Sequence, residues 1–366
     1  MFSNLQSIKK FISDKKFKRI FILTGKKSYV LSGAKKIFPK LLRGKEVNFY
    51  YKTSSFPTIN ELKKIIISLK KFSPDLIMAI GGGCVLDYAK AANAISIDLN
   101  LDKKIIYNKI SLKKICKLAA IPTTAGSGAE VTSNAVIYID KIKYSIEGDL
   151  IKPDYFFLLP ELVIKNSKKI KSSSGFDAIA QAVESMLSKK SNLKSIYFAK
   201  KSLKISLKNY LDYLKNPNYN NSQAMCLAAN LSGKAISISK TTAPHAVSYP
   251  FTSLYSISHG HAVSLTLEKF LKFNFINLKN SNCNFDLNKR YKNIFNIFNV
   301  KDIFELEKFF INMKKSANLE SNFEKLGINI NLNINKILDG INIQRLKNNP
   351  IDLNKSDLKY ILLKSR

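Results

Sequence analysis

Tryptophan is absent from this chain of 366 residues, and histidine occurs only three times. No run of eighteen or more apolar residues is present, so the sequence predicts no transmembrane helix. Residues 1–16 lack the continuous apolar segment and the small-residue cleavage site of a secretory signal peptide. Hydrophobic residues still make up 45% of the chain, which is enough for large buried cores. We therefore expect a soluble, globular protein of the cytoplasm.

Cysteine is scarce and dispersed, since the four cysteines form no C-x-x-C pair. Their spacing disfavours a zinc knuckle, a redox motif and a disulfide framework. We expect buried thiols in a reducing compartment at Cys84, Cys116, Cys226 and Cys283.

Acidic residues are also few, because 26 Asp and Glu stand against 60 Lys and Arg, for a formal charge of +34. A patch of positive charge binds a nucleic-acid backbone by releasing its counterions. Here the lysines are scattered along the chain, which disfavours nucleic-acid binding, and a basic nucleic-acid-binding protein is kept as the non-enzyme alternative. A positive field equally attracts a small anionic substrate.

The first half of the chain alternates short apolar runs with segments of helical periodicity. The predicted strands are residues 18–24, 47–51, 75–80 and 118–122, and the predicted helices between them are 30–42, 62–72 and 85–95. This alternation predicts an α/β fold with a doubly wound parallel sheet, whose ligands bind at the carboxyl ends of the strands.

After residue 163 the strand signal fades and helical periodicity takes over. It is clear in residues 176–187, 193–214, 223–239, 262–273 and 304–317. We therefore predict two domains, an α/β dinucleotide-binding domain at 1–163 and an all-helical metal and substrate domain at 164–366.

Two polar loops follow predicted strands of the first domain. Gly81, Gly82 and Gly83 stand between a strand and a helix, where backbone N–H groups and the helix dipole hold a pyrophosphate. The second loop, residues 123–128, adds three hydroxyl groups and two glycines. Side by side the loops would form one dinucleotide groove. Asp87 and Lys90, in the first turns of the following helix, are expected to be ordinary surface charges unless they contact the ligand.

All three histidines, His245, His259 and His261, fall in residues 244–262. Neutral imidazole is the commonest nitrogen ligand of catalytic metals. A buried acid would complete such a site, and Asp177 shares one face of an apolar helix with Gln181 and Glu184. One carboxylate and two imidazoles, with a weak fourth ligand or water, form a workable divalent-metal site.

Four motifs resemble the iron-containing, or group III, alcohol dehydrogenase family. They are GGGCVLDYAK at 81–90, PTTAGSGAEVT at 122–132, GFDAIAQAVES at 175–185, and HAVSYP with SHGHAV between 245 and 263. The resemblance covers residues 18–275 and implies a dehydroquinate synthase-like architecture. It also implies a homodimer with a metal in the cleft between the two domains of each chain.

The resemblance also assigns roles to residues of this sequence. It implies that the cofactor, NADPH or NADH, contacts Gly81, Gly82, Gly83, Asp87, Thr123, Thr124 and Ser127, and that Asp177, His245 and His259 bind Fe²⁺ or Zn²⁺.

The chain departs from the family pattern at three places. Gln181 stands where the family has a histidine ligand, and a glutamine carbonyl is a poorer ligand than imidazole for these metals. Tyr249 stands where many members have a further histidine. Residues 24–27 read TGKK where the family often has an acid that binds the ribose hydroxyls. The loss of that acid favours NADPH over NADH.

The resemblance implies reversible hydride transfer between the nicotinamide and a small aldehyde, with Gln181 as a possible fourth metal ligand. Tyr249, His261 or metal-bound water would supply the proton, and the sequence does not choose among them. Residues 239–245 and Gln181 resemble the phosphonoacetaldehyde reductases of the family. A phosphonate substrate would then bind Lys240 together with the hydroxyls of Thr241 and Thr242, unless Lys240 is a solvated cation at a helix end.

Two further enzyme classes share this fold. One is a dehydroquinate-synthase-like lyase, and the other is a metal-free maleylacetate-type reductase. Net oxidation of the nicotinamide by an aldehyde separates a reductase from a synthase, and metal analysis separates the two kinds of reductase.

Overall fold

The computed structural model describes residues 4–140 and 142–364. The chain divides into two compact units. The first contains the chain up to Ser167 together with Asn218–Cys226, and the second contains Lys168–Pro217 and the chain from Leu227 onward. The division into domains at 1–163 and 164–366 stays a prediction.

The first unit is built on a parallel sheet in the order β2-β1-β3-β4-β7. Its strands are β1 (Arg19–Gly25), β2 (Glu46–Lys52), β3 (Leu76–Gly81), β4 (Lys117–Pro122) and β7 (Tyr155–Phe156). β1, β3 and β4 are central strands with almost continuous burial, as expected for a parallel sheet covered on both faces. The predicted α/β fold with a doubly wound sheet is confirmed.

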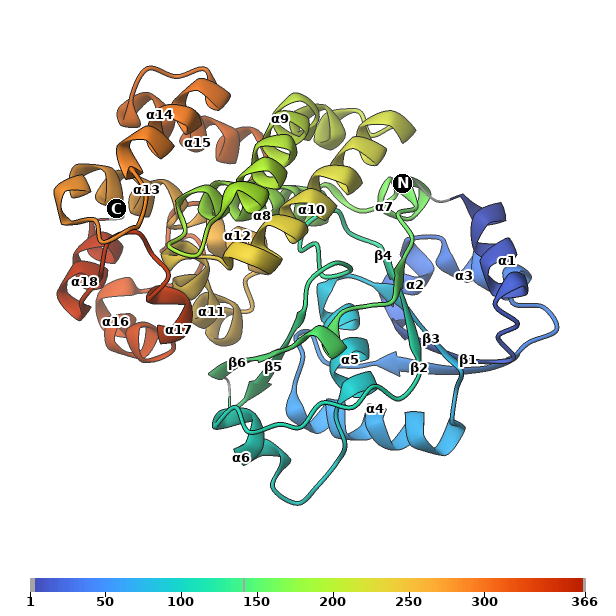
Figure 1. Ribbon diagram of the computed structural model, residues 1–366. Helices are drawn as coiled ribbons and strands as arrows, with labels where there is room; N and C mark the ends of the chain where they lie inside the picture. Colours follow the sequence, from blue (N-terminus) through green and yellow to red (C-terminus); the bar gives the residue numbers. More distant parts are fainter. Residues whose placement is uncertain (1–3, 141, 365–366) are drawn as a thin grey trace. The chain divides into compact units, whose positions relative to one another are not determined.

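Side chains alternate between the two faces of this sheet and enter two separate cores. Phe21, Leu23 and Ile77 pack with α4 (Ile59–Phe72) and α5 (Gly83–Ala94). Ile20 and Ile22 pack with α1 (Leu5–Asp14) and α3 (Ala34–Leu41) on the opposite face. The helices of the two layers are visible on either side of the strands in Figure 1. Helices therefore cover both faces of the sheet, and the carboxyl ends of the strands are the part of the sheet that can bind a ligand.

A two-stranded antiparallel hairpin, β5 (Asn134–Ile139) and β6 (Ile142–Glu147), was not predicted. It follows the second glycine-containing loop and packs on α5. The remaining elements of this unit are short: α2 (Lys26–Leu31), α6 (Leu101–Ile106), the 3-10 turn η1 (Asp149–Ile151) and α7 (Pro160–Val163).

The second unit is helical, with no strand among its described residues and one isolated bridge between Ser281 and Ile351. Its long helices are α8 (Lys168–Leu187) and α9 (Leu193–Lys215), with most of α10 (Tyr219–Ser239). The others are α11 (Ala243–Tyr255), α12 (His259–Ser264), α13 (Leu267–Ile276), η2 (Leu278–Asn280), α14 (Leu287–Phe298), α15 (Ile303–Ser316), α16 (Ile330–Asp339), α17 (Ile343–Leu346) and α18 (Lys355–Leu363).

α8 is the central helix of this unit, and all its residues from Gly175 to Leu187 are buried. Small residues such as Ala178 and Ala182 allow neighbouring helices to approach it closely. α9 and α12 both pack on it. Polar side chains on α8 are therefore enclosed by protein and must find partners there.

Among the described residues, no helix is both long enough and apolar enough to cross a lipid bilayer.

Candidate functional site

Asp177, His245 and His259 come together in the second unit, as the predicted metal site requires. One ligand atom of each residue lies within 4.8 Å of the other two. The Nε2 atoms of His245 and His259 are 3.3 Å and 3.9 Å from Asp177 Oδ1. Asp177 and His245 are buried, whereas the His259 side chain is 35% exposed. The exposed side of the group therefore lies at His259, where a small ligand would enter.

His259 reaches Asp177 because α12 packs closely on α8 at Gly260. A Cβ atom on Gly260 would lie 2.0 Å from the carbonyl oxygen of Ser173 and 2.8 Å from Asp177 Cβ. The hydroxyl of Ser173 also accepts a hydrogen bond of 3.1 Å from the backbone N–H of His261. Glycine between two histidines thus allows the contact that brings His259 to the carboxylate.

His245 lies in the first turn of α11 with its imidazole between two carboxylates. Its Nδ1 is hydrogen-bonded to Glu184 Oε1, and its Nε2 faces Asp177. Burial alone would lower the pKa of His245, but the carboxylates of Glu184 and Asp177 outweigh burial and raise it to about 9. Within the described part of the chain, the buried Nε2 has no hydrogen-bond partner. An imidazole nitrogen in this setting suits a divalent cation, which would replace the proton.

Gln181 is buried on α8, one turn after Asp177. Its Nε2 donates a hydrogen bond of 3.1 Å to Asp177 Oδ2, and its Oε1 accepts one of 3.0 Å from Ser232 on α10. With these bonds Gln181 orients the second oxygen of Asp177. Its predicted role as a metal ligand stays a prediction.

Tyr249 lies one turn after His245 on α11. Its ring stacks on the His259 imidazole, with ring centroids 5.8 Å apart and an angle of 21° between the planes. Burial raises the pKa of the Tyr249 hydroxyl to about 12, with Arg345 acting in the opposite direction. The phenol therefore carries its proton at neutral pH and lies beside the group of ligands.

His261 has a different environment. Its Nε2 is 2.7 Å from the carbonyl oxygen of Glu320, and burial lowers its pKa. It does not belong to the group formed by Asp177, His245 and His259. The structure therefore separates the three histidines into two that converge on a carboxylate and one that binds a backbone carbonyl.

Lys240 follows the last residue of α10 and has a left-handed backbone, with φ of 61°. This conformation costs a non-glycine residue roughly 1–2 kcal/mol. Asn348 holds it in place, because its side-chain amide donates to the carbonyl oxygens of Ser239 at 2.8 Å and Thr241 at 2.9 Å. The motif NNP at 348–350 thus fixes the loop that precedes His245.

The two predicted cofactor loops pack directly on each other in the first unit. A Cβ atom on Gly83 would lie 2.9 Å from Ser127 Oγ, and one on Gly82 would lie 3.4 Å from Thr124 Oγ1. The backbone N–H of Thr123 donates to the carbonyl oxygen of Gly81 at 3.0 Å. Glycines at the start of a 12-residue helix, lined by hydroxyl groups, form a suitable cradle for a pyrophosphate.

Lys90 is not an ordinary surface charge, and the role of Asp87 in cofactor binding stays a prediction. Lys90 is 1% exposed, and its ammonium donates to the carbonyl oxygen of Ala129 at 3.0 Å and to Thr132 Oγ1 at 2.8 Å. Asp87 Oδ1 lies 3.5 Å from the Lys90 ammonium. Burial raises the pKa of the Asp87 carboxyl, although the charge of Lys90 acts in the opposite direction. A buried ammonium must be hydrogen-bonded, and here its partners lie in the segment that directly follows the second loop.

The end of β1 has no acidic side chain. Gly25 is its last residue, and a Cβ atom there would meet Ser28 Oγ at 2.8 Å and Lys52 Cε at 3.7 Å. Lys52 is a basic residue that the sequence did not single out at this position. Lys26 and Lys27 begin α2 and are exposed. Lysines therefore lie at the end of β1, at the position where the family often has an acid that binds the ribose hydroxyls.

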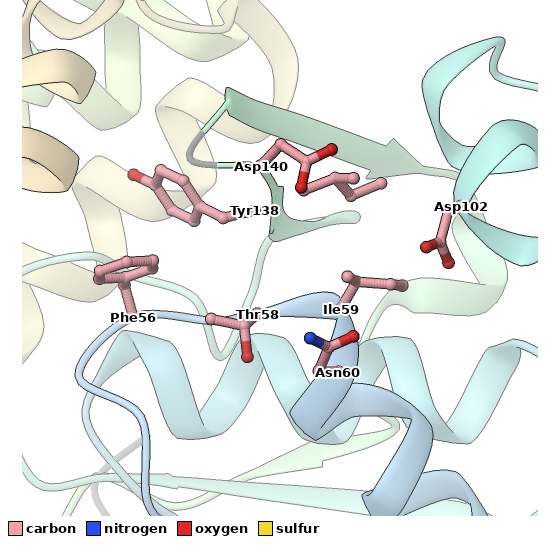
Figure 2. Close-up of a pocket in the computed structure, with 8 residues that line it drawn as sticks. Phe56, Thr58, Ile59, Asn60, Asp102, Tyr138 and Asp140 are labelled. Atoms are coloured by element: carbon pink, nitrogen blue, oxygen red, sulfur yellow. The ribbon is translucent and has the colours of Figure 1, made fainter.

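A separate hollow of about 250 Å³ lies between the β5–β6 hairpin and the start of α4. Figure 2 shows Tyr138 and Asp140 of the hairpin along one side of it, Phe56, Thr58 and Asn60 along the opposite side, and Asp102 at the right. None of the site residues predicted from the sequence lines it. It is distinct from both candidate sites.

Comparison with known protein families gives matches along nearly the whole chain. Residues 2–160 match the model of iron-containing alcohol dehydrogenases, and residues 171–366 match the model of the C-terminal part of that family.

Curated relatives cover less of the chain. A phosphonoacetaldehyde reductase from Streptomyces viridochromogenes is 31% identical over 217 residues, which are 56% of this chain and 55% of that protein. A 1-propanol dehydrogenase from Citrobacter freundii is 31% identical over 222 residues, covering 60% and 56%. The match thus spans little more than half the length of these relatives.

Among solved structures, a sulfoacetaldehyde reductase from Bifidobacterium kashiwanohense in complex with NAD⁺ has the same fold. It has a TM-score of 0.86 and 24% identity over 100% of this chain and 95% of that one.

Proposed function

Because the chain belongs to the iron-containing alcohol dehydrogenase family, we propose that it catalyses reversible hydride transfer between a nicotinamide dinucleotide and a small aldehyde. The observation that carries this proposal is the convergence of Asp177, His245 and His259 on one point. Their sequence separation is large, so only the packing of α8, α11 and α12 brings them together. A buried carboxylate oxygen that faces two imidazole nitrogens is a donor set that suits a divalent cation.

The residues of this group fit a divalent metal. Asp177 supplies a carboxylate oxygen, and His245 and His259 supply imidazole nitrogens, which suits Fe²⁺ or Zn²⁺. When bound, such a metal polarises an aldehyde oxygen as a Lewis acid and stabilises negative charge that develops there. The main role that we give Gln181 is to orient the Asp177 carboxylate through its hydrogen bond. Gln181 is also the candidate for a fourth metal ligand.

The proposed cofactor site consists of the two loops in the first unit. Gly81, Gly82 and Gly83 would hold the pyrophosphate at the start of α5, and Thr123, Thr124 and Ser127 would line the groove. Asp87 would act from the first turns of α5, next to Lys90.

The absence of an acid at Gly25, with Lys26, Lys27 and Lys52 nearby, supports NADPH over NADH.

We propose that Tyr249 donates the proton that completes the reduction of the aldehyde. Its buried phenol stacks on His259 and carries a proton at neutral pH, so it can donate to a developing alkoxide. His261 is the weaker alternative because its Nε2 is already held at 2.7 Å from the carbonyl oxygen of Glu320. Water at the metal is the third source that the sequence left open.

For the substrate we propose a small aldehyde with an anionic group, with phosphonoacetaldehyde, reduced to 2-hydroxyethylphosphonate, as the candidate. The 31% identity to a phosphonoacetaldehyde reductase supports this choice, as does the basic loop at Lys240. An ammonium suits phosphoryl oxygens, and Lys240 supplies one. The hydroxyl of Thr242 is not a donor for the substrate, because it donates to Glu184 Oε2 at 2.9 Å. The formal charge of +34 would further attract an anion.

The test is oxidation of NADPH and NADH by the purified protein with phosphonoacetaldehyde and, in parallel, with propionaldehyde. We expect faster turnover of the phosphonate at low concentration. Lys240→Ala should raise KM for phosphonoacetaldehyde roughly tenfold or more, the loss expected for a charge-assisted bond, and leave propionaldehyde unchanged. Lys234→Ala, at a half-buried lysine of α10, is the matched control. Equal KM values for both aldehydes in the wild-type protein would refute the anionic substrate while leaving aldehyde reduction in place.

Two features of the whole protein remain proposals. We propose a homodimer, as in the family, which light scattering after size-exclusion chromatography would test. Cytoplasmic location also stays a prediction.

A further inference from the structure

Glu184 occupies a position on α8 that the proposed chemistry does not use directly. Its spacing from Asp177 and Gln181 puts it on the same helix face, and it is 1% exposed. A carboxylate buried to this degree is costly unless its oxygens are fully hydrogen-bonded. Its partners therefore indicate what it is for.

The two oxygens of Glu184 bind two different groups of α11. Oε1 is hydrogen-bonded to Nδ1 of His245, and Oε2 accepts bonds from the backbone N–H of Thr242 at 2.7 Å and its hydroxyl at 2.9 Å. Thr242 is the N-cap residue of α11 and uses its hydroxyl for Glu184 rather than for its own helix. A single carboxylate thus fixes the start of α11 and the imidazole one turn further on.

The bond at Nδ1 determines how His245 can act. A carboxylate at Nδ1 requires a proton there, which leaves Nε2 as the nitrogen available to a cation. Nε2 is the atom that lies 3.3 Å from Asp177 Oδ1. Glu184 itself does not join the group of possible ligands, because it lies on the Nδ1 side of the ring.

We propose that Glu184 is a positioning residue that holds His245 in the orientation and tautomer that present Nε2 to the metal. The inference rests on the proposed metal centre. It assigns the affinity of that centre partly to a residue that does not touch the cation. Carboxylate partners of this kind contribute a factor of roughly 10 to 100 in metal affinity.

Glu184→Gln is the main test variant, because it keeps the shape of the side chain and removes the charge. An amide cannot accept from both Nδ1 and the two donors of Thr242, so the imidazole loses its fixed tautomer. We expect Zn²⁺ affinity, measured by competition with a chromophoric chelator, to fall roughly 10- to 100-fold. The absorption spectrum of the Co²⁺-loaded protein should change as well.

Thr242→Val is the matched control. It removes the hydroxyl donor to Glu184 and leaves the bond between Glu184 and His245 intact. It should retain Zn²⁺ affinity within about threefold, since only one neutral donor is lost. Thermal unfolding of the metal-free variants separates a loss of folding from a loss of metal affinity.

A second measurement uses the wild-type protein, whose sequence contains only three histidines. Long-range ¹H–¹⁵N correlation spectra of the zinc-loaded, ¹⁵N-histidine-labelled protein should show His245 protonated at Nδ1 and bound to metal through Nε2. A proton on Nε2 would overturn the role of Glu184, and so would unchanged Zn²⁺ affinity in Glu184→Gln. If the wild-type protein binds neither Zn²⁺ nor Co²⁺, the metal centre of the proposed function fails first.

Discussion

At the scale of single residues, the chemistry of the candidate site depends on buried polar groups with defined partners. The sequence indicated Asp177, His245 and His259, because acids and imidazoles are the residues that metals require. It did not indicate the bond between Glu184 and His245. These residues are separated by 61 positions, and only the packing of α8 with α11 decides that they meet.

Lys90 shows the same limit for a positive charge. Its sequence context, in the first turns of a helix, is typical of a solvated lysine, but the side chain turns inward to the loop at Ala129 and Thr132. The signal that was available is the small size of its neighbours Ala89, Ala91 and Ala92, which are all buried. An apolar helix face with a lysine in it predicts an internal partner for the ammonium.

Lys90→Met is therefore expected to weaken cofactor binding without touching the cofactor loops themselves. The change leaves two acceptors just after the second loop, on Ala129 and Thr132, without their donor, which costs about 1–3 kcal/mol each when they remain buried. NADPH affinity measured by fluorescence titration should fall, and the urea midpoint should decrease. Lys64→Met, at an exposed position of α4, is the control and should change neither. Normal NADPH affinity in Lys90→Met would contradict the role given to this residue.

At the scale of elements, the helices and the four longer strands of the parallel sheet were largely predictable. Continuous apolar runs followed by glycine or threonine loops marked β1, β3 and β4. The β5–β6 hairpin was missed because it pairs with itself and lies outside the alternation of strand and helix. The two-residue strand β7 gives no periodic signal at all.

The closeness of α8 and α12 is an element-scale feature that one glycine controls. Gly260→Ala would place a methyl group 2.0 Å from the carbonyl oxygen of Ser173, which the backbone must relieve by moving α12 and His259 away. We expect a loss of about 3 kcal/mol in the free energy of unfolding, at the upper end for overpacking, together with weaker metal binding.

Gly340→Ala is the control for this prediction. Its Cβ would meet no atom closer than 3.0 Å, and φ at this position is −84°. Urea unfolding and Zn²⁺ titration of both variants provide the measurements. A Gly260→Ala protein with wild-type stability and Zn²⁺ affinity would show that the close approach of α12 does not position His259.

At the scale of the whole molecule, the sequence correctly predicted family, fold class and the order of the α/β and helical parts. The family models match both halves of the chain, and the parallel sheet and the helical unit follow that order. The scattered lysines make the molecule strongly positive. Most of its ion pairs lie at the surface, where each contributes little to the free energy of unfolding. The net charge therefore bears on the attraction of anions rather than on the fold.

The central claim is that Asp177, His245 and His259 hold a metal that aldehyde reduction requires. The most direct measurement is the rate of NADPH or NADH oxidation by a short aldehyde, recorded while metal-free protein is titrated anaerobically with Fe²⁺ or Zn²⁺ and bound metal is determined alongside. The rate should rise with bound metal and level off when each chain holds one ion, and Asp177→Asn should abolish this dependence. Full activity in the chelator-treated, metal-free protein would contradict the account.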